Sequence, residues 1–313
     1  MNTQQDSEPR LTLLALAIAA FLLASGCARP MLTVNDVIAV NGLQTTFDAY
    51  AEHTAPIGHV DKLLGVNVTF LADGKEIGTA TTDSRGFARY CCRVPQGAQL
   101  IEGRAEIDGR ALKGLGRVFV WDPVRTTIVV DIDETISATN YGTLIDGKEE
   151  DIGSQPLAGA AEAVGRLAKR FNVLYVSARP RFLLEKTRRW LSRHGFPAGP
   201  VITTPSLAEA IRVQKFKGGT IADLQVLSDG LLIGIGNART DSEAYAANGL
   251  LPIIIDDADS NRFRSHAVVV RNWAMVEKFF EANKEVLEAP ARLRQALAGE
   301  EFLLRPVIKW QPT

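Results

Sequence analysis

The chain has 313 residues, of which 46% are hydrophobic and 23% are charged. This composition is that of a globular protein that can bury one or two sizeable cores, and it excludes a chain that is disordered throughout. Because 35 Lys and Arg residues are matched by 36 Asp and Glu, the formal net charge is only −1, which excludes a general basic field for nucleic acid.

The first predicted element is the apolar run from Leu11 to Leu23, which small residues and then Cys27 follow. A helix needs about 20 residues to span a bilayer, so this run has the length of the apolar part of a signal peptide. The ending LASGC resembles the lipobox of bacterial lipoproteins, in which the cysteine is lipidated and becomes the new N-terminus. That resemblance implies a signal peptide over residues 1–27 and a lipid anchor at Cys27 in the bacterial cell envelope. Ala28 implies the periplasmic face of the outer membrane. A plain signal anchor and a buried cytoplasmic helix are the alternative interpretations.

From Gly65 to Trp121 the chain alternates apolar and polar residues in short runs that glycine-bearing turns separate. A period of two with frequent turns predicts a small antiparallel β-sandwich. The stretch GTATTDSRGFARY also resembles the repeat of bacterial immunoglobulin-like domains. We therefore predict an immunoglobulin-like domain over residues 28–122, in which residues 28–64 hold a linker and a first strand.

After Trp121 the pattern changes to alternating short apolar runs and amphipathic segments. TTIVVDID and NVLYVSA are typical of buried strands, and the stretch from Pro180 to Gly195 is typical of a helix. Such alternation predicts an α/β domain over residues 123–313, with a doubly wound, mostly parallel sheet. Ligands in these sheets bind beyond the carboxyl ends of the strands, which is where Asp131 and Asp133 fall.

Four short motifs follow strands or open helices in this part of the chain. The segment DIDET, residues 131–135, resembles the first motif of the haloacid dehalogenase-like superfamily, whose phosphatases carry D-x-D-x-T. LYVSARP supplies Ser177 for the second motif, and QKFKGGTIADL offers Lys217 or Lys215 for the third. GNARTDSEAY places Asn237 and Asp241 where the superfamily has an acidic pair.

Residues 125–257 are most similar to the lipin-type phosphatidate phosphatases within that superfamily. The similarity rests on SARP, on FK before an aspartate-leucine helix and on GNARTDSEAY, which is similar to the lipin pattern G-N-R-x-x-D-x-x-A-Y. The FK match favours Lys217 over Lys215. The chain departs from lipins at Glu134, where they have glycine, and at Ala238, where they have arginine.

The resemblance implies a Mg²⁺-dependent phosphatase with an aspartyl-phosphate intermediate. Asp131 would bind the metal and attack phosphorus, and Asp133 would offer its backbone carbonyl to the metal and act as general acid and base. Asn237 and Asp241 would complete the metal site. A lysine would neutralise the transition state.

Three further residues are expected to meet the substrate. Ser177 would donate a hydrogen bond to a phosphoryl oxygen. Arg179 would meet a phosphate or an anionic headgroup, or be a surface charge, and Thr135 would contact the substrate or cap the following turn.

The segment from Ile136 to Pro156 is long enough for a flap and too short for a cap domain, so we expect an open site. An open site can reach a phosphate on a large or embedded substrate. Together with the anchor, this predicts a membrane phospholipid such as phosphatidate as the substrate. The alternatives are a phosphatase of another phosphomonoester and an inactive lipin-like lipid-binding module. No nucleic-acid partner is predicted.

Overall fold

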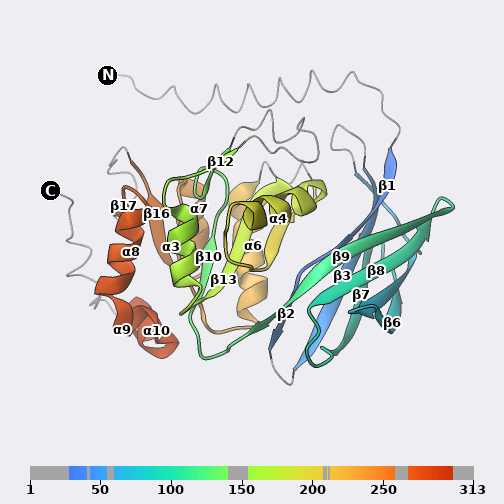
Figure 1. The fold of residues 1–313 in the computed structure, drawn as a ribbon, viewed down its shortest axis with the longest axis horizontal. Helices are drawn as coiled ribbons and strands as arrows, with labels where there is room; N and C mark the ends of the chain where they lie inside the picture. The colour runs from blue at the N-terminus through green and yellow to red at the C-terminus, as the bar shows by residue number, and fades with distance from the viewer. Residues whose placement is uncertain are drawn as a thin grey trace, which may run out of the picture.

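The computed structural model describes residues 28–40, 43–54, 60–139, 154–206, 210, 212–257 and 267–298. In residues 28–121, here called the β-region, the helices and strands that the structure describes are all strands, and residues 122–298 form a mixed α/β-region beside it (Figure 1). The predicted signal segment and Cys27 lie outside the described residues. Within the described ranges, no helix has the length and apolar character needed to cross a membrane.

The β-region consists of two sheets. The first contains β1 (Arg29–Val34), β3 (Gln44–Thr54), β4 (Val60–Lys62) and β7 (Phe87–Arg93). In it, β1, β4 and β7 each pair antiparallel with β3. The second has the order β2-β9-β8-β5-β6, with bounds Val37–Val40, Arg110–Trp121, Leu100–Ile107, Asn67–Ala72 and Lys75–Thr81. Its ladders are antiparallel except between β2 and β9, which run parallel. Residues from both sheets, such as Phe47 and Phe70, form one buried core.

Residues 28–64 contain four strands, where the sequence predicted a linker and one strand. The longest of them, β3, alternates exposed and buried residues only in its first half, and the four consecutive residues from Ala49 to Glu52 are all buried. A strand buried on both faces loses the period of two that reveals strands in a sequence. The likeness of the β-region to immunoglobulin-like domains stays a prediction.

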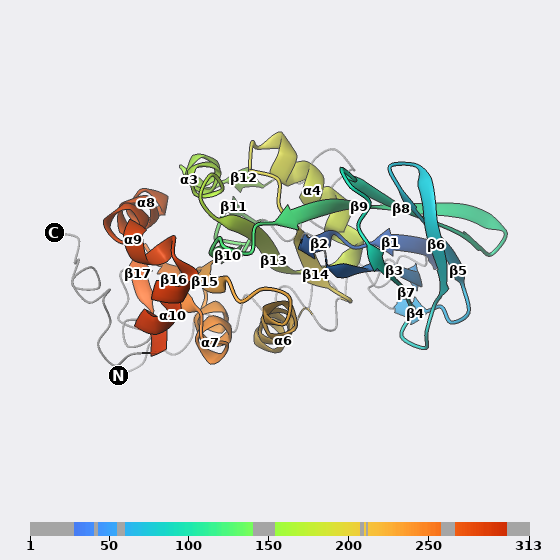
Figure 2. The same ribbon diagram turned by 90° about the horizontal axis from the view of Figure 1, so that it is seen from below.

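The α/β-region is built on six parallel strands in the order β14-β13-β10-β15-β16-β17. Their bounds are Val201–Thr204, Asn172–Pro180, Thr127–Val130, Leu231–Gly236, Leu251–Ile255 and Val268–Val270. One face carries α3 (Ala160–Leu167), α4 (Leu184–Arg193), α8 (Trp273–Ala282), α9 (Lys284–Leu287) and α10 (Pro290–Ala298). The other carries α6 (Val213–Gln225) and α7 (Arg239–Ala247) (Figure 2). The predicted doubly wound parallel sheet is therefore confirmed.

The central strand β10 explains where the site lies. All four of its residues are buried, because helices cover both faces of the sheet, and β13 and β15 flank it. The chain leaves β10 at Asp131, and β11 (Ser137–Ala138) then pairs antiparallel with β12 (Gln155–Pro156). The two ends of the predicted flap thus lie side by side, and its middle, residues 140–153, is outside the described part of the chain.

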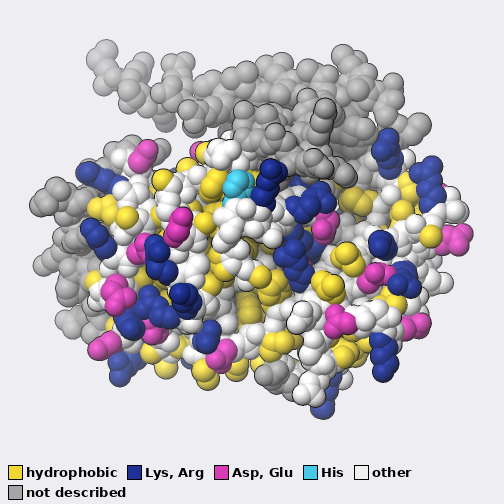
Figure 3. Space-filling model, viewed as in Figure 1, with side chains coloured by type: hydrophobic (Ala, Val, Ile, Leu, Met, Phe, Trp, Pro, Cys, Tyr) yellow, Lys and Arg dark blue, Asp and Glu magenta, His cyan; other side chains and the backbone are white. Residues whose placement is uncertain are grey.

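The two regions are in contact along α6. Ile38 and Phe119 of the β-region pack against the apolar cluster that contains Ile221 and Leu224 of α6. On the face of the molecule shown in Figure 3, basic and acidic side chains are interspersed over both regions, in line with the balanced composition. The described surface on this side therefore shows no single broad field of one charge sign.

Candidate active site

Asp131 lies at the carboxyl end of the central strand, where the sequence places it. Its backbone N–H donates to the carbonyl of Ile235 in β15 at 2.9 Å, which extends the strand pairing by one residue. Its side chain is 6% exposed. The hydroxyl of Thr135 lies 3.0 Å from Asp131 Oδ2 because the chain turns back after Ile132, whose carbonyl accepts from three following amides. The carboxylate that the sequence predicts as nucleophile is thus buried and held in one orientation.

Lys217 connects this strand end to α7. Its Nζ lies 2.5 Å from Asp131 Oδ1 and 2.5 Å from Asp241 Oδ1, and its side chain is 3% exposed. Lys215, two residues earlier on α6, is exposed and lines a cavity on another side of the helix. The structure therefore brings Lys217, and not Lys215, to the site.

Asp241 and Asn237 belong to the turn between β15 and α7. Asp241 Oδ2 accepts from the backbone N–H groups of Asn237 and Ala238 at 3.1 and 3.0 Å, so the carboxylate caps the helix start. With Oδ1 on Lys217, both of its oxygens have partners. Asn237 Oδ1 lies 3.2 Å from the Thr135 hydroxyl, next to Asp131.

Asp133 turns away from this group. Its carboxylate accepts from Arg179 Nε and Nη2 at 3.0 and 2.9 Å, and from the hydroxyls of Ser177 and Thr139 at 2.8 and 2.7 Å. Ser177 and Arg179, both expected to contact substrate, instead hold Asp133 here, and the Arg179 side chain is 1% exposed. The interpretation of Arg179 as a surface charge is therefore wrong.

The charges of the site shift its pKa values in opposite directions. Burial, opposed by Lys217 and reinforced by the neighbouring Asp241 and Asp133, raises the pKa of Asp131 to about 7. Burial alone would also raise the pKa of Asp133, but the guanidinium of Arg179 and the hydrogen bonds to the carboxylate lower it. Burial would lower the pKa of Lys217, yet Asp131 and Asp241 raise it well above its usual value. Lys217 is therefore an ammonium ion at neutral pH.

The donor set bears on the predicted Mg²⁺. Within the described ranges, no three His, Cys, Asp or Glu side chains lie close enough to hold a metal ion. The hard oxygen donors that converge are Asp131 Oδ2 and Asn237 Oδ1, both beside the Thr135 hydroxyl. Three carboxylates face two cationic side chains, Lys217 and Arg179, which leaves one excess negative charge when all are ionised. Oxygen donors in a negative site fit a hard divalent cation, although the side chains of Asp133 and Asp241 are engaged elsewhere.

The turn after Asp133 depends on residues that the sequence did not reveal. Glu134 has a positive φ of 59°, a conformation that suits the glycine of lipins, and its Oε1 accepts from the N–H of Thr139 at 3.1 Å. Trp273 of α8 donates from Nε1 to the Thr135 carbonyl at 2.8 Å. Thr139 and Trp273 thus fix the turn. No motif marks either residue, and only the fold shows that they reach it.

Comparison with known proteins gives one family match. Residues 128–255 match the family model described as PITM 1-3, LNS2 domain. This range runs from β10 to β16 and contains the residues of the site described above except Trp273. Among curated proteins, none matches the chain.

Several solved structures align with parts of the chain. A Had-superfamily hydrolase from Ehrlichia chaffeensis is 14% identical, with 52% of this chain and 98% of that one covered and a TM-score of 0.34. The core domain of a putative phosphoglycolate phosphatase from Streptococcus pneumoniae is 15% identical, with 50% and 96% covered and a TM-score of 0.30. Titin M4 is 11% identical, with 30% and 94% covered and a TM-score of 0.23. Scores this low do not by themselves establish a shared fold.

Proposed function

We propose that this protein is a phosphohydrolase that removes phosphate from a phosphomonoester through an aspartyl-phosphate on Asp131. The observation that carries the proposal is the position of Asp131 at the end of the central strand, with Lys217 Nζ 2.5 Å from its Oδ1. A carboxylate can attack phosphorus only when nearby positive charge offsets the repulsion between the two anions. The match of residues 128–255 to an LNS2 domain supports a phosphatase of this class.

Asp131 would act as the nucleophile. One of its oxygens forms the bond to phosphorus while the bond from phosphorus to the leaving oxygen breaks. Lys217 keeps the carboxylate oriented and opposes the rise of its pKa, and Asp241 also binds the ammonium group of Lys217. Thr135 fixes the second oxygen of Asp131, so that the attacking group has one orientation before substrate arrives.

Asp133 would move the proton. It gives a proton to the leaving oxygen in the first step, and in the second it takes one from the water that attacks phosphorus and breaks the bond to Asp131. Arg179 and Ser177 hold the carboxylate of Asp133 at the same edge of the sheet as Asp131. The first step starts from protonated Asp133 and leaves it ionised, and Arg179, which lowers the pKa of Asp133, favours this ionised form that the water-activating second step needs.

A divalent cation such as Mg²⁺, when bound, would supply the positive charge that the site lacks and draw the phosphate toward Asp131. The side chains of Asp131 and Asn237, with the backbone carbonyl of Asp133, would hold it. Asp241 would act indirectly, since its oxygens bind Lys217 and the backbone of the turn.

The proposed substrate is a membrane phospholipid such as phosphatidate. The short segment between β11 and β12 leaves no room for a cap domain, and the similarity of GNARTDSEAY to lipins supports a lipid phosphate.

Purified protein should release phosphate from phosphatidate in mixed micelles, and EDTA should stop the release. Asp131→Asn should abolish turnover, while Asp229→Asn, an exposed carboxylate outside the site, should not. Phosphate release from soluble esters but not from phosphatidate would exclude the lipid as substrate and would leave a phosphatase of another phosphomonoester.

A lipid-binding module without turnover is the second candidate. The observation in its favour is the extensive pairing of Asp133 with Arg179, which leaves the expected acid in a salt bridge. In that case vesicles with phosphatidate should bind wild type and Asp131→Asn equally, and neither protein should release phosphate. Measurable turnover that Asp131→Asn abolishes would exclude it.

We also propose that Cys27 anchors the protein in the bacterial cell envelope, at the periplasmic face of the outer membrane. The support is the LASGC segment of the sequence. Cys27→Ser should abolish the incorporation of labelled fatty acid into the protein, and unchanged incorporation would contradict the anchor.

A further inference from the structure

The contact between the two regions contains a buried ion pair that the proposed chemistry does not use. Asp36, between β1 and β2, lies 2.7 Å from Nη2 of Arg188 in α4, and the two side chains are 0% and 3% exposed. Asp36 also accepts from the backbone N–H of Arg117 at 2.9 Å and of Val201 at 2.9 Å. A buried carboxylate with this many partners fixes the groups that donate to it.

Arg188 extends this junction further into the β-region. Its Nη1 donates to the carbonyl of Leu115 at 2.7 Å and its Nη2 lies 3.3 Å from the carbonyl of Val34, while Glu185 also contacts it. The guanidinium of Arg181 lies 3.7 Å from the ring centroid of Tyr50 in β3. Two arginines of one short segment of the α/β-region are therefore embedded in the β-region.

The elements that Asp36 holds are the neighbours of the strand end that carries Ser177 and Arg179. Val201 begins β14, which pairs with β13, and Thr203 lies opposite Ser177 in that ladder. Arg188 follows Thr187, whose hydroxyl accepts from Arg179 Nη1 at 3.2 Å. Arg179 in turn pairs with Asp133. A continuous series of contacts thus runs from Asp36 through Arg188, Thr187 and Arg179 to Asp133.

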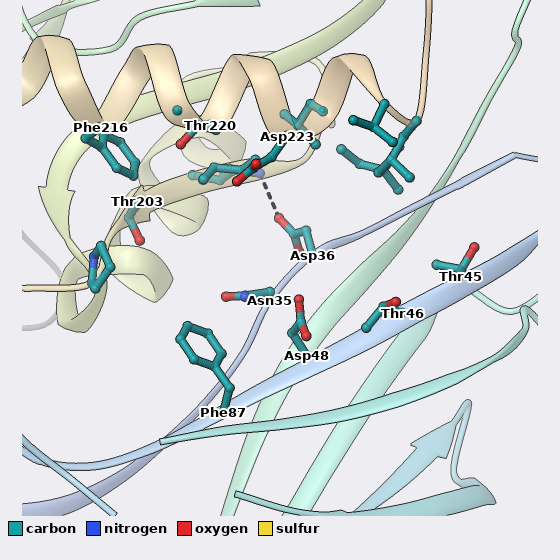
Figure 4. Close-up of a pocket in the computed structure, with 18 of the residues that line it drawn as sticks. Asn35, Asp36, Thr45, Thr46, Asp48, Phe87, Thr203, Phe216, Thr220 and Asp223 are labelled. Atoms are coloured by element: carbon teal, nitrogen blue, oxygen red, sulfur yellow. Dashed lines mark hydrogen bonds between the residues drawn. The ribbon is translucent and has the colours of Figure 1, made fainter. Parts of the chain in front are cut away.

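One part of the junction between the regions is open. A cavity of about 660 Å³ lies between α6 and β14 on one side and the strands around Asn35 and Asp48 on the other. Figure 4 shows Phe216 and Thr220 of α6 facing Asn35 and Asp48 across it, with Asp36 between them. Since the walls are apart here, the ion pair of Asp36 and Arg188 is a defined point at which the β-region can hold the catalytic region.

We propose that the β-region is a part of the catalytic unit, and that Asp36 is a positioning residue which, through Arg188 and Thr187, sets the place of Arg179 and hence of Asp133. This rests on the proposed function, in which Asp133 moves the proton. Asp36 does not touch the reacting atoms, so its removal affects the rate of the chemical step more than the binding of substrate.

The test compares full-length variants on phosphatidate in mixed micelles and on a soluble phosphomonoester, both with Mg²⁺. Asp36→Asn removes the charge, and the double variant Asp36→Asn with Arg188→Met leaves no unpaired charge buried. Asp73→Asn is the matched control, because Asp73 also accepts from two backbone amides but lies in the β5–β6 turn at the far edge of the second sheet. We expect kcat of both Asp36 variants to fall on the order of tenfold with KM nearly unchanged, and Asp73→Asn to keep both constants.

Amide hydrogen exchange gives a readout that does not need activity. In the Asp36 variants, peptides covering residues 177–190 should exchange faster, while those of α8 should not change. Folded variants with the wild-type kcat and unchanged exchange would overturn the proposal and leave the phosphatase function standing. If wild type showed no turnover and the Asp36 variants still showed the expected faster exchange, the phosphatase function would be refuted and the coupling between Asp36 and residues 177–190 would stand. Failure of both Asp36 variants to fold would also contradict it, since the pair would then be a folding requirement.

Discussion

Among single residues, Lys217 pairs with two carboxylates of the site. Its ammonium group lies between the carboxylates of Asp131 and Asp241, and all three side chains are almost fully buried. Lys217→Met would leave two buried carboxylates facing each other, so the pKa of Asp131 would rise further and less of the nucleophile would be ionised.

We expect Lys217→Met to lower kcat on the order of 10²-fold to 10³-fold, as loss of one preorganised cationic group does in other enzymes. Lys215→Met is the matched control, since Lys215 is exposed on the same helix. Steady-state assays on a soluble ester, with circular dichroism to verify folding, measure the difference. If Lys215→Met lost activity and Lys217→Met kept it, the assignment of the lysine would be wrong.

The raised pKa of Asp131 predicts how cation binding depends on pH. With a pKa of about 7, Asp131 is mostly protonated at pH 6 and mostly ionised at pH 8, and a metal ligand must be ionised. Affinity for Mg²⁺, measured by calorimetry without substrate, should therefore be about tenfold higher at pH 8 than at pH 6. Asp131→Asn should remove this dependence. Equal affinities of wild type at the two pH values would contradict the role of Asp131 as a ligand.

Residues with a motif could be predicted from the sequence, and residues without one could not. Asp131, Lys217 and Asp241 follow strands or open helices in a recognisable order, and the structure brings them together. The sequence did not show that Arg179 binds Asp133, because the contact depends on the turn after β10 and the end of β13 meeting in space.

At the scale of elements, the close approach of β15 and α7 leaves no room at Gly236. A Cβ built there would lie 2.6 Å from the Asp241 side chain. Gly236→Ala should push Asp241 away from Lys217 and lower kcat on the order of tenfold or more. Gly219→Ala, on an open face of α6, should keep activity and raise the free energy of unfolding by about 0.5 to 1 kcal/mol. Activity assays and urea unfolding of both variants measure this, and full activity of Gly236→Ala would contradict the expected displacement.

The turn between β10 and β11 holds Glu134 in the left-handed region at a φ of 59°. Glu134→Gly should change the free energy of unfolding by less than about 1 kcal/mol, because relief of strain offsets the lost bond to Thr139. The valine of Glu134→Val cannot accept this hydrogen bond and is β-branched, so the substitution should lower the free energy of unfolding by about 1 to 3 kcal/mol. Urea unfolding compares the three proteins. A valine variant as stable as wild type would show that the turn does not require this conformation.

Elements with a clear period were predictable, and elements buried on both sides were less so. The six parallel strands are short apolar runs between helices, a pattern that identifies a doubly wound sheet. The strands β1 to β4 were partly missed, since β3 is buried on both faces in its second half. Burial of this kind is decided by the partner sheet and not by the local sequence.

At the scale of the whole molecule, the arrangement of the two regions was not visible in the sequence. Asp36 and Arg188 are separated by 152 positions, and each by itself is typical of an exposed charged residue. Their pairing arises only when α4 and the loop after β1 meet. The β-region, which sequence analysis treated as a separate domain, thus contacts two elements that flank the site, α4 and β14.

The central claim is that Asp131 forms a covalent bond to phosphorus. Protein mixed with ³²P-labelled phosphatidate and Mg²⁺, then quenched in acid during turnover, should retain label that hydroxylamine releases, as expected of an acyl phosphate. Asp131→Asn should retain none, and Asp229→Asn should retain as much as wild type. Turnover by wild type without any trapped label, or equal labelling of Asp131→Asn, would contradict the claim.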